Sequence, residues 1–397
     1  MTHYKYLIIG AGMTGDAAVR GIRSVDKDGS IGLIGLEPDP PYKRPPLTKG
    51  LWKGQKFETI WYNTRDLADL HLGRAVREID RPNKRVLDNE GAEYTYEKLL
   101  LAMGGTPRRL PFGGEDINYY RTAEDYRRLQ AATERSKRFA VIGGGFIGSE
   151  IGAALAMNGR EVVMIFPGDG ISSNIFPPDL SRFVNTYYRG KGVEVVAGAT
   201  VSGLERRGAT LSLNTRAEQD GAEHTIEVDE VVAGLGIQLN LELAQKAGLE
   251  VEDAIVVDEF LRTNDSDIFA AGDVAFFFNP ALGKRIRVEH EDNAKTMGRV
   301  AGRNMAGEDT AYAHLPFFYS DLFDLGYEAV GELDSRLETV SDWKEPFREG
   351  VVYYLQDGRI RGVLLWNVWK QLDAARRLIA ETGPFTASDL RGRLPQA

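Results

Sequence analysis

The sequence of 397 residues contains no cysteine. This absence excludes disulfide frameworks, thiolate metal sites, cysteine-ligated iron–sulfur clusters and every catalytic thiol. Long hydrophobic runs are missing too, because no stretch approaches the roughly 20 consecutive apolar residues that a membrane-spanning helix needs. We therefore expect no metal site and no membrane span, and any redox chemistry has to proceed without a thiol.

An excess of positive charge is also lacking. Lysine and arginine number 49 against 58 acidic residues, which gives a formal net charge of −9. Because proteins bind nucleic acid largely through Lys and Arg that neutralise phosphates, a nucleic-acid partner is disfavoured. The first residues run directly into an apolar segment without the features of a secretion signal, so we expect a cytoplasmic protein. At this length, two or three globular domains are expected.

A dinucleotide-binding pattern opens the chain. The apolar run 4–9 predicts a strand, and the turn Gly10-Ala11-Gly12-Met13-Thr14-Gly15 follows it, ahead of a helical segment at 16–24. In this pattern the first glycine makes a tight turn, the second lets the backbone approach a pyrophosphate, and the third allows helix and strand to pack closely. A second predicted strand, 31–36, is followed by Glu37, whose carboxylate can accept hydrogen bonds from a ribose diol. We predict a nucleotide site at Gly10, Gly12, Gly15 and Glu37.

The same pattern occurs a second time. Residues 139–142 predict a strand, Gly143-Gly144-Gly145-Phe146-Ile147-Gly148 the turn, and 149–158 a helix, with a further strand at 161–166. Two such units indicate two bound dinucleotides, and a protein that holds two usually moves a hydride between them. Gly143, Gly145 and Gly148 are therefore predicted to bind the second cofactor.

The end of the strand 161–166 is where the ribose of the second nucleotide is expected to be recognised. An NADP site needs an arginine here for the 2′-phosphate, and none occurs between Glu161 and Asp179. NADH is therefore favoured over NADPH. Asp169 is the acid nearest to the expected position, and a ribose contact and a solvated turn residue are equally consistent with it.

Five segments extend these patterns over nearly the whole chain: 41–49 (PYKRPPLTK), 143–150, 271–274 (AGDV), 288–294 (VEHEDNA), and 319–321 followed by 326–331 (YSD and GYEAVG). With them, the sequence resembles the FAD-dependent pyridine nucleotide oxidoreductases, in particular the group of apoptosis-inducing factor and the ferredoxin reductases of bacterial oxygenase systems.

This resemblance implies an α/β fold with two Rossmann-like dinucleotide-binding domains, of the three-layer, glutathione-reductase-like kind, and a C-terminal α+β domain. The implied bounds are 1–113 and 241–313 for the FAD-binding domain, 114–240 for the NAD-binding domain, and 314–397 for the C-terminal domain. Gly236 opens the segment that resembles the return to the FAD-binding domain, and it is included among the predicted cofactor-binding residues.

The resemblance also implies contacts to FAD. Asp273 would bind the ribityl chain, Arg44 would contact the cofactor, and Lys49 would lie beside the N5 edge of the flavin. Glu289 and His290 begin a helix expected at 289–305, which would point at the pyrimidine end of the flavin. The N–H groups and dipole of that helix would favour negative charge on the reduced ring. His290 would line the site, with no proton transfer required of it.

Four residues have implied catalytic roles: Lys49, Glu150, Phe146 and His290. Glu150 would lie within reach of both the nicotinamide and Lys49, and a Lys–Glu pair at N5 can stabilise the reduced flavin and orient NADH. Phe146 would stack over the isoalloxazine and move aside for the nicotinamide; the alternative is an ordinary core aromatic residue.

The lack of cysteine excludes the disulfide reductases and the sulfenate-dependent peroxidases of this fold. Direct electron transfer from FAD to an external acceptor remains, and a small iron–sulfur protein such as ferredoxin or rubredoxin is the expected partner. Two alternatives stay open: a quinone reductase, which the charged residues within 366–380 disfavour, and a redox-gated binding protein with slow turnover. A monomer and a homodimer fit equally well.

An acidic iron–sulfur partner needs a local basic face for docking. Three clusters are candidates, and ordinary solvated helix faces explain each of them equally well: Arg127 with Arg128, Arg135 with Lys137 and Arg138, and Arg376 with Arg377.

Overall fold

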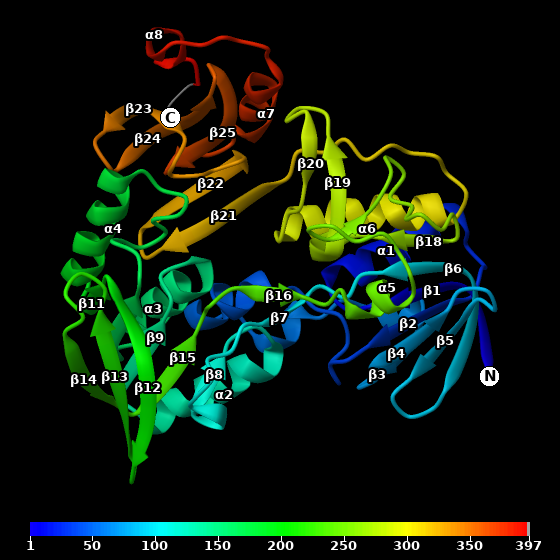
Figure 1. Ribbon diagram of the computed structural model, residues 1–397, viewed down its shortest axis with the longest axis horizontal. Helices are drawn as coiled ribbons and strands as arrows, with labels where there is room; N and C mark the ends of the chain where they lie inside the picture. Colours follow the sequence, from blue (N-terminus) through cyan, green and yellow to red (C-terminus); the bar gives the residue numbers. More distant parts are fainter. Residues whose placement is uncertain (395–397) are drawn as a thin grey trace. The chain divides into compact units, whose positions relative to one another are not determined.

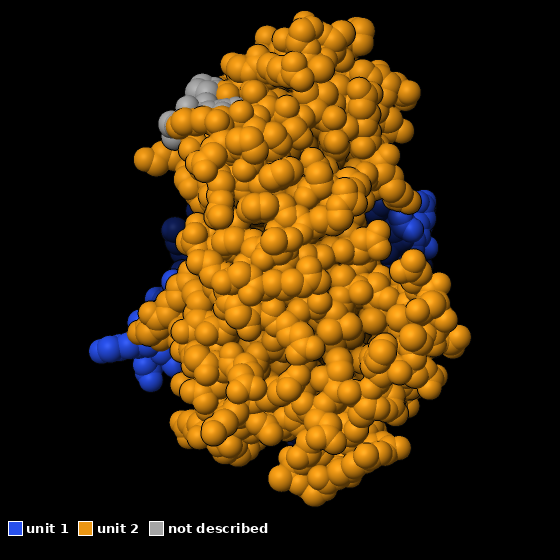
Figure 2. Space-filling model, turned by 90° about the vertical axis from the view of Figure 1, so that its left-hand side faces the viewer, with its two compact units in different colours: residues 1–44, 56–106, 238–317 blue, residues 45–55, 107–237, 318–397 orange. Residues whose placement is uncertain are grey.

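The computed structural model describes residues 1–394 (Figure 1). The chain forms two compact units, which Figure 2 shows in blue and orange. Unit 1 comprises residues 1–44, 56–106 and 238–317, and unit 2 comprises 45–55, 107–237 and 318–397. Unit 2 thus contains most of the predicted NAD-binding domain and most of the predicted C-terminal domain, whereas 238–240 and 314–317 belong to unit 1. Residues 395–397 lie outside the described part. The division into three domains stays a prediction.

The segment 45–55 belongs to unit 2, whereas the sequence assigned it to the FAD-binding domain. Its contacts give the reason. The hydroxyl of Tyr120 donates to the carbonyl of Leu47 at 2.5 Å, and the amide of Asn158 donates to the carbonyl of Trp52 at 3.1 Å. The Trp52 ring also packs edge-on against Tyr126, with centroids 5.4 Å apart. These long-range contacts have no local sequence signal.

A seven-stranded sheet forms the core of unit 1, in the order β3-β2-β1-β6-β5-β4 with β18 paired to β6. β1 is parallel to β2 and β6, and the β4–β5–β6 part is antiparallel. Strands buried on both faces read as continuous apolar runs, as β2 does. The strands are β1 (Thr2–Ile9), β2 (Ile31–Gly35), β3 (Asp69–Leu72), β4 (Val76–Asp80), β5 (Arg85–Asp88), β6 (Glu93–Leu101) and β18 (Ile268–Ala270).

Helices α1 (Met13–Val25) and α6 (Glu291–Met305) pack against each other through glycines. A β-carbon at Gly302 would lie 2.1 Å from the carbonyl oxygen of Ala18, so only glycine permits this approach. α6 begins at Glu291, two residues later than expected, because His290 is its extended N-cap residue. Unit 1 also contains α5 (Glu242–Lys246), β17 (Ile255–Val256), β19 (Ala275–Asn279) and β20 (Lys284–Ile286).

Unit 2 contains a parallel sheet in the order β11-β10-β9-β15-β8. Its strands are β8 (Ile117–Tyr119), β9 (Arg138–Ile142), β10 (Glu161–Phe166), β11 (Val193–Ala197) and β15 (Glu230–Ala233). The helices are α2 (Ala123–Arg135), α3 (Phe146–Met157) and α4 (Pro178–Gly190), and an antiparallel sheet of β12 (Ala199–Arg207), β13 (Thr210–Ala217) and β14 (Glu223–Val228) follows (green in Figure 1).

The C-terminal part of unit 2 is a five-stranded sheet in the order β21-β22-β25-β24-β23 (orange to brown in Figure 1). It consists of β21 (Phe317–Leu322), β22 (Leu325–Gly331), β23 (Glu338–Glu345), β24 (Glu349–Gln356) and β25 (Arg359–Trp366), followed by α7 (Leu372–Ala380) and α8 (Ala387–Leu390). β7 (Gly105–Pro107) pairs separately with β16 (Ile237–Leu239). The predicted fold class, with two Rossmann-like regions and a C-terminal α+β part, is confirmed.

The carboxyl of Glu328, on β22, makes the stability of the folded protein depend on pH. Burial raises the pKa of its carboxyl above the ordinary value of 4.5, and among residues 1–394 its Oε2 atom has no hydrogen-bond partner. The folded state therefore holds this proton more tightly than the unfolded chain, so Glu328 lowers stability as pH rises from 4.5 through the raised pKa. We expect Glu328→Gln to raise the unfolding temperature at pH 7, and to raise it less as pH falls towards 4.5.

Thermal unfolding across this pH range measures the effect. Glu338→Gln, at an exposed glutamate on the same sheet, is the matched control and should leave the unfolding temperature nearly unchanged. An equal gain for Glu328→Gln at every pH would contradict the explanation.

Candidate active site

The first glycine turn joins β1 to α1 and leaves an open cradle. Gly10 has φ +120°, and a β-carbon there would lie 2.1 Å from the carbonyl oxygen of Ala102. At Gly15 a β-carbon would lie 2.1 Å from the carbonyl oxygen of Gly10. At Gly12, by contrast, a β-carbon would meet nothing within 4 Å. This free space in front of the N-terminus of α1 suits a pyrophosphate, as a dinucleotide cofactor requires.

Three polar residues predicted to bind FAD lie near one another in unit 1. The carboxylate of Glu37 accepts hydrogen bonds from the hydroxyl of Tyr42, at 2.5 Å, and from the guanidinium of Arg44. Asp273 follows β18 in a short 3-10 turn, Gly272–Val274. Burial opposes the charged form of Arg44, but its electrostatic interactions with Tyr42, Glu37 and Asp273 outweigh burial and raise the pKa of Arg44. Glu37, Arg44 and Asp273 thus form one electrostatic cluster.

Glu289 and His290 precede α6 rather than lying in its first turn. The side chain of Glu289 forms an ion pair with Arg287, and that of His290 is half-buried. The backbone of His290 is extended, with φ −124° and ψ 154°. The positive end of α6 therefore starts immediately after these two residues, and their contacts to FAD remain predictions.

The second glycine turn repeats the geometry of the first between β9 and α3. Gly143 has φ +115°, and its β-carbon would lie 2.4 Å from the carbonyl oxygen of Gly234. A β-carbon at Gly148 would lie 1.9 Å from the carbonyl oxygen of Gly143, whereas one at Gly145 would meet nothing within 4 Å. Unit 2 consequently has its own cradle in front of a helix N-terminus, which suits NADH.

Asp169 and Gly236 lie at loops of the same parallel-sheet region. The side chain of Asp169 is exposed three residues beyond the end of β10, and both of its interpretations stay open. Gly236 has φ +78°, and its carbonyl accepts a hydrogen bond from the backbone N–H of Arg108 at 3.0 Å. This backbone conformation favours glycine by itself, so a cofactor contact at Gly236 remains a prediction.

Glu150, in the first helical turns of α3, is buried and accepts three side-chain hydrogen bonds. The ammonium of Lys49 donates to Oε1 at 2.6 Å, and the hydroxyl of Ser320 donates to the same oxygen at 2.6 Å. The hydroxyl of Thr48 donates to Oε2. Only 4% of the Glu150 side chain and 13% of the Lys49 side chain are exposed. Burial of an ion pair requires such hydrogen bonds to offset the loss of hydration.

Aromatic rings surround this pair. The ammonium of Lys49 lies 5.1 Å from the ring centroid of Tyr319, in cation–π geometry. Phe146 packs edge-on against Phe318, with centroids 5.3 Å apart. The Phe146 ring thus has an aromatic packing partner within unit 2. Its role as a movable cover for the flavin remains a prediction.

Two tyrosines next to the pair stay uncharged. Burial, together with the charge of Glu150, raises the pKa of Tyr188 and of Tyr327 well above the ordinary value of 10.0. Neither hydroxyl therefore ionises at neutral pH.

Two residues of this site had no role in the sequence interpretation, Thr48 and Ser320. Both lie inside recognised motifs, next to Lys49 and Tyr319, but a hydroxyl in a motif does not reveal which acid it bonds. Their partner Glu150 is more than 100 positions away in the sequence.

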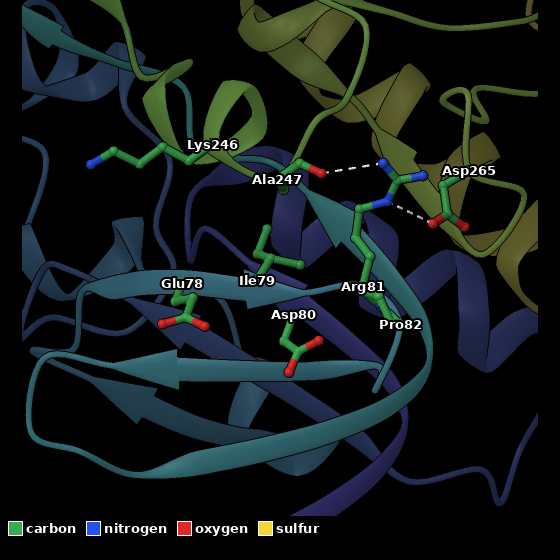
Figure 3. Close-up of a pocket in the computed structure, with 8 residues that line it drawn as sticks. All are labelled: Glu78, Ile79, Asp80, Arg81, Pro82, Lys246, Ala247 and Asp265. Atoms are coloured by element: carbon green, nitrogen blue, oxygen red, sulfur yellow. Dashed lines mark hydrogen bonds and ion pairs between the residues drawn. The ribbon is translucent and has the colours of Figure 1, made fainter.

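A separate hollow of about 630 Å³ lies in unit 1 (Figure 3). Arg81 crosses it, donating to Asp265 at 2.9 Å and to the carbonyl of Ala247 at 3.2 Å. The predicted site residues are not among those that line it. Because its arginine is already paired, we assign no ligand to this hollow.

Two further properties concern the described residues as a whole. Within residues 1–394 no group of three or more histidine, aspartate or glutamate side chains is arranged to hold a metal ion. No helix of the same residues is long and apolar enough to cross a membrane.

Two dinucleotide cradles and a buried Lys–Glu pair, in a chain without cysteine, define a flavoprotein oxidoreductase of the two-dinucleotide type. The family model described as pyridine nucleotide-disulphide oxidoreductase matches residues 4–298. A second model, for the C-terminal part of mitochondrion-associated apoptosis-inducing factor, matches 301–346 and 341–381. The chain belongs to the pyridine nucleotide-disulphide oxidoreductase family, which confirms the resemblance seen in the sequence. It is accordingly an FAD-dependent enzyme that uses NADH.

The relatives of this chain include ferredoxin reductases of oxygenase systems and apoptosis-inducing factors, the two groups that the sequence resembles. The ferredoxin–NAD(+) reductase component of the anthranilate 1,2-dioxygenase system of Burkholderia cepacia is 35% identical over 394 residues, which cover 96% of this chain and 95% of that protein. Apoptosis-inducing factor 1 of Dictyostelium discoideum is 35% identical over 425 residues, covering 95% and 78%. The covalent putidaredoxin reductase–putidaredoxin complex contains a chain with a TM-score of 0.88 and 27% identity, covering 98% of this chain and 95% of that one.

Proposed function

We propose that this protein oxidises NADH at a bound FAD and passes the electrons to a small iron–sulfur protein of the ferredoxin or rubredoxin type. The observation that carries the proposal is the buried, hydrogen-bonded Lys49–Glu150 pair in a chain that contains no cysteine. No dithiol can receive the electrons within the protein, so an external acceptor has to take them. The oxygenase-system relatives, which are ferredoxin reductases by name, support an iron–sulfur acceptor.

The residues of the chain have separable tasks in this proposal. FAD, when bound, supplies the capacity to accept a hydride and release electrons singly. Gly12 and the N-terminus of α1 would hold its pyrophosphate, while Gly145 and the N-terminus of α3 would hold that of NADH. The ammonium of Lys49 would stabilise negative charge on the reduced flavin, and Glu150 would keep the ammonium in place.

Burial makes this arrangement effective. Because Lys49 and Glu150 are shielded from water, their electrostatic interactions are weakly screened, and a preorganised charge needs no reorientation during the reaction. Tyr319 covers Lys49 through its ring without adding charge. The pair thus contributes orientation and electrostatic stabilisation rather than proton transfer.

NADH should reduce the flavin far better than NADPH. The segment between the end of β10 and Asp179 offers no arginine for a 2′-phosphate, and the exposed Asp169 would repel one. We expect kcat/KM for NADH to exceed that for NADPH by about tenfold or more, since one missing charge-assisted contact accounts for a factor of this size. Anaerobic stopped-flow absorbance with each nucleotide measures the ratio, and a ratio near one would contradict this explanation.

The acceptor is tested in a second mixing step. Enzyme reduced anaerobically with NADH is mixed with an oxidised [2Fe–2S] ferredoxin, with a rubredoxin or with a short-chain quinone. Rapid reoxidation by either iron–sulfur protein, faster than by the quinone, supports the proposal. Preferential reoxidation by the quinone would establish the quinone reductase instead. A long-lived reduced enzyme with every acceptor would favour the redox-gated binding protein, which the match to the C-terminal part of apoptosis-inducing factor keeps as the second candidate.

The structure disfavours a membrane-docking segment at 366–380. Trp366 and Val368 are fully buried, and Leu378 and Ile379 of α7 are buried as well. Trp369 is 44% exposed and Leu372 is half-buried. These buried apolar residues therefore belong to the core of the C-terminal part.

The three basic clusters are largely neutralised by neighbouring carboxylates. Arg135 pairs with Glu230 at 2.9 Å and Arg138 with Glu194 at 2.9 Å. The remaining pairs are Arg127 with Glu124 and Arg376 with Asp373. None of the clusters is therefore proposed as the docking face for the iron–sulfur protein. A cytoplasmic location and a monomeric or homodimeric state also remain predictions, which cell fractionation and sedimentation would test.

A further inference from the structure

Three consecutive residues of β21 each contact a different predicted catalytic residue within unit 2. Phe318 packs against Phe146, the ring of Tyr319 lies under the ammonium of Lys49, and Ser320 donates to Glu150. Side chains alternate between the two faces of a strand. The middle residue therefore reaches Lys49 from the opposite face to the one that contacts α3.

The contact of Ser320 differs in kind from the other two. Its hydroxyl and the ammonium of Lys49 donate to the same oxygen of Glu150, both at 2.6 Å. A carboxylate oxygen has two lone-pair directions, so the serine occupies one and leaves the other for the lysine. Ser320 thereby restricts the direction from which Lys49 can approach Glu150.

Ser320 is itself held in one orientation. Its side chain is fully buried on β21, next to β22, which carries Tyr327. Tyr327 in turn stacks on Trp366, with centroids 5.8 Å apart. The hydrogen bond from Ser320 thus links this C-terminal sheet to Glu150.

We infer that Ser320 is a positioning residue for hydride transfer, which fixes Glu150 and, through it, the ammonium of Lys49. The inference rests on the proposed role of the Lys49–Glu150 pair. Thr48 bonds the other carboxylate oxygen and adjoins Lys49 in the sequence, so it anchors the local segment. Ser320 is the group by which the C-terminal sheet acts on the same carboxylate.

The test compares Ser320→Ala with Ser320→Thr in the FAD-loaded protein. We expect Ser320→Ala to lower the limiting rate of flavin reduction at saturating NADH by about tenfold, the usual scale for loss of one hydrogen bond to a charged group. The dissociation constant of NADH should stay unchanged, and the midpoint potential of the bound flavin should become more negative because Lys49 is held less firmly. Ser320→Thr retains the hydroxyl, so its limiting rate of flavin reduction and its flavin midpoint potential should lie close to those of the unmodified protein.

A double-mutant cycle separates positioning from a general structural effect. In a Glu150→Ala background, Ser320→Ala should cause no further loss of rate; an equal tenfold loss there would overturn the inference. Ser212→Ala is the matched control, because the Ser212 hydroxyl is buried in unit 2 and has no hydrogen-bond partner within residues 1–394. It should change neither rate nor potential.

The remaining outcomes distinguish failure of the inference about Ser320 from failure of the proposed role of the Lys49–Glu150 pair. If Glu150→Ala slows reduction but Ser320→Ala does not, the pair keeps its role and the inference about Ser320 is wrong. If Glu150→Ala itself leaves the rate unchanged, the proposed role of the pair fails and the inference fails with it. Thermal unfolding of each variant verifies that the compared proteins are folded.

Discussion

Flavin reduction by NADH is expected to slow by about 10²- to 10³-fold when Glu150 is replaced by alanine, the range measured for removal of one preorganised electrostatic group. The substitution leaves the ammonium of Lys49, only 13% exposed, without its carboxylate. It also removes the acceptor of Thr48 and Ser320. The loss should appear in the limiting rate at saturating NADH, measured by anaerobic stopped-flow absorbance at the flavin band.

Two further variants define the cause of this loss. Glu161→Ala removes an exposed glutamate at the start of β10 in the same unit and should leave the rate within about twofold of the unmodified protein. Glu150→Gln keeps the acceptor oxygen for a hydroxyl but removes the charge, so its rate should fall between those of the alanine variant and the unmodified protein. If Glu150→Ala is folded and its rate lies within threefold of that of the unmodified protein, the proposed role of the pair is wrong. A threefold change in rate corresponds to about 0.7 kcal/mol in activation free energy.

Loss of FAD is the expected result of Gly12→Ala. A β-carbon at Gly12 would meet no protein atom within 4 Å, so the chain should fold around it without strain. The same methyl group would enter the space through which the backbone approaches the pyrophosphate. We expect the affinity for FAD to fall by about tenfold or more, the effect of one steric obstruction costing ~1.4 kcal/mol. The flavin content after purification and titration of the flavin-free protein measure the change.

The matched control is Gly190→Ala, at the end of α4, where a β-carbon likewise meets nothing within 4 Å. This variant should purify with a normal flavin content. Gly10→Ala forms the opposite comparison, because its β-carbon would lie 2.1 Å from a backbone oxygen and φ is +120°, so the fold itself should be disturbed. Undiminished flavin content in Gly12→Ala would show that the first glycine turn is not the pyrophosphate site.

The sequence by itself determined the features that depend on neighbouring residues. Each glycine turn, with its strand and helix, is a local unit, so its spacing indicated the two cradles at Gly12 and Gly145. The strand expected at 161–166 agrees with β10, because a continuous apolar pattern reflects burial within one segment. The absence of cysteine excluded thiol chemistry without any structure.

Only the tertiary structure decided how distant segments meet. Within unit 2, the hydroxyls of Thr48 and Ser320 reach one carboxylate of α3 from segments 102 and 170 positions away. The packing of Phe146 on Phe318 and the pairing of the basic clusters with acids are of the same kind. Hydrogen bonds and ion pairs act over a few ångströms in space, whereas periodicity and spacing describe neighbours along the chain. Motifs therefore predicted which residues matter, and the fold determined which of them act on the same charged group.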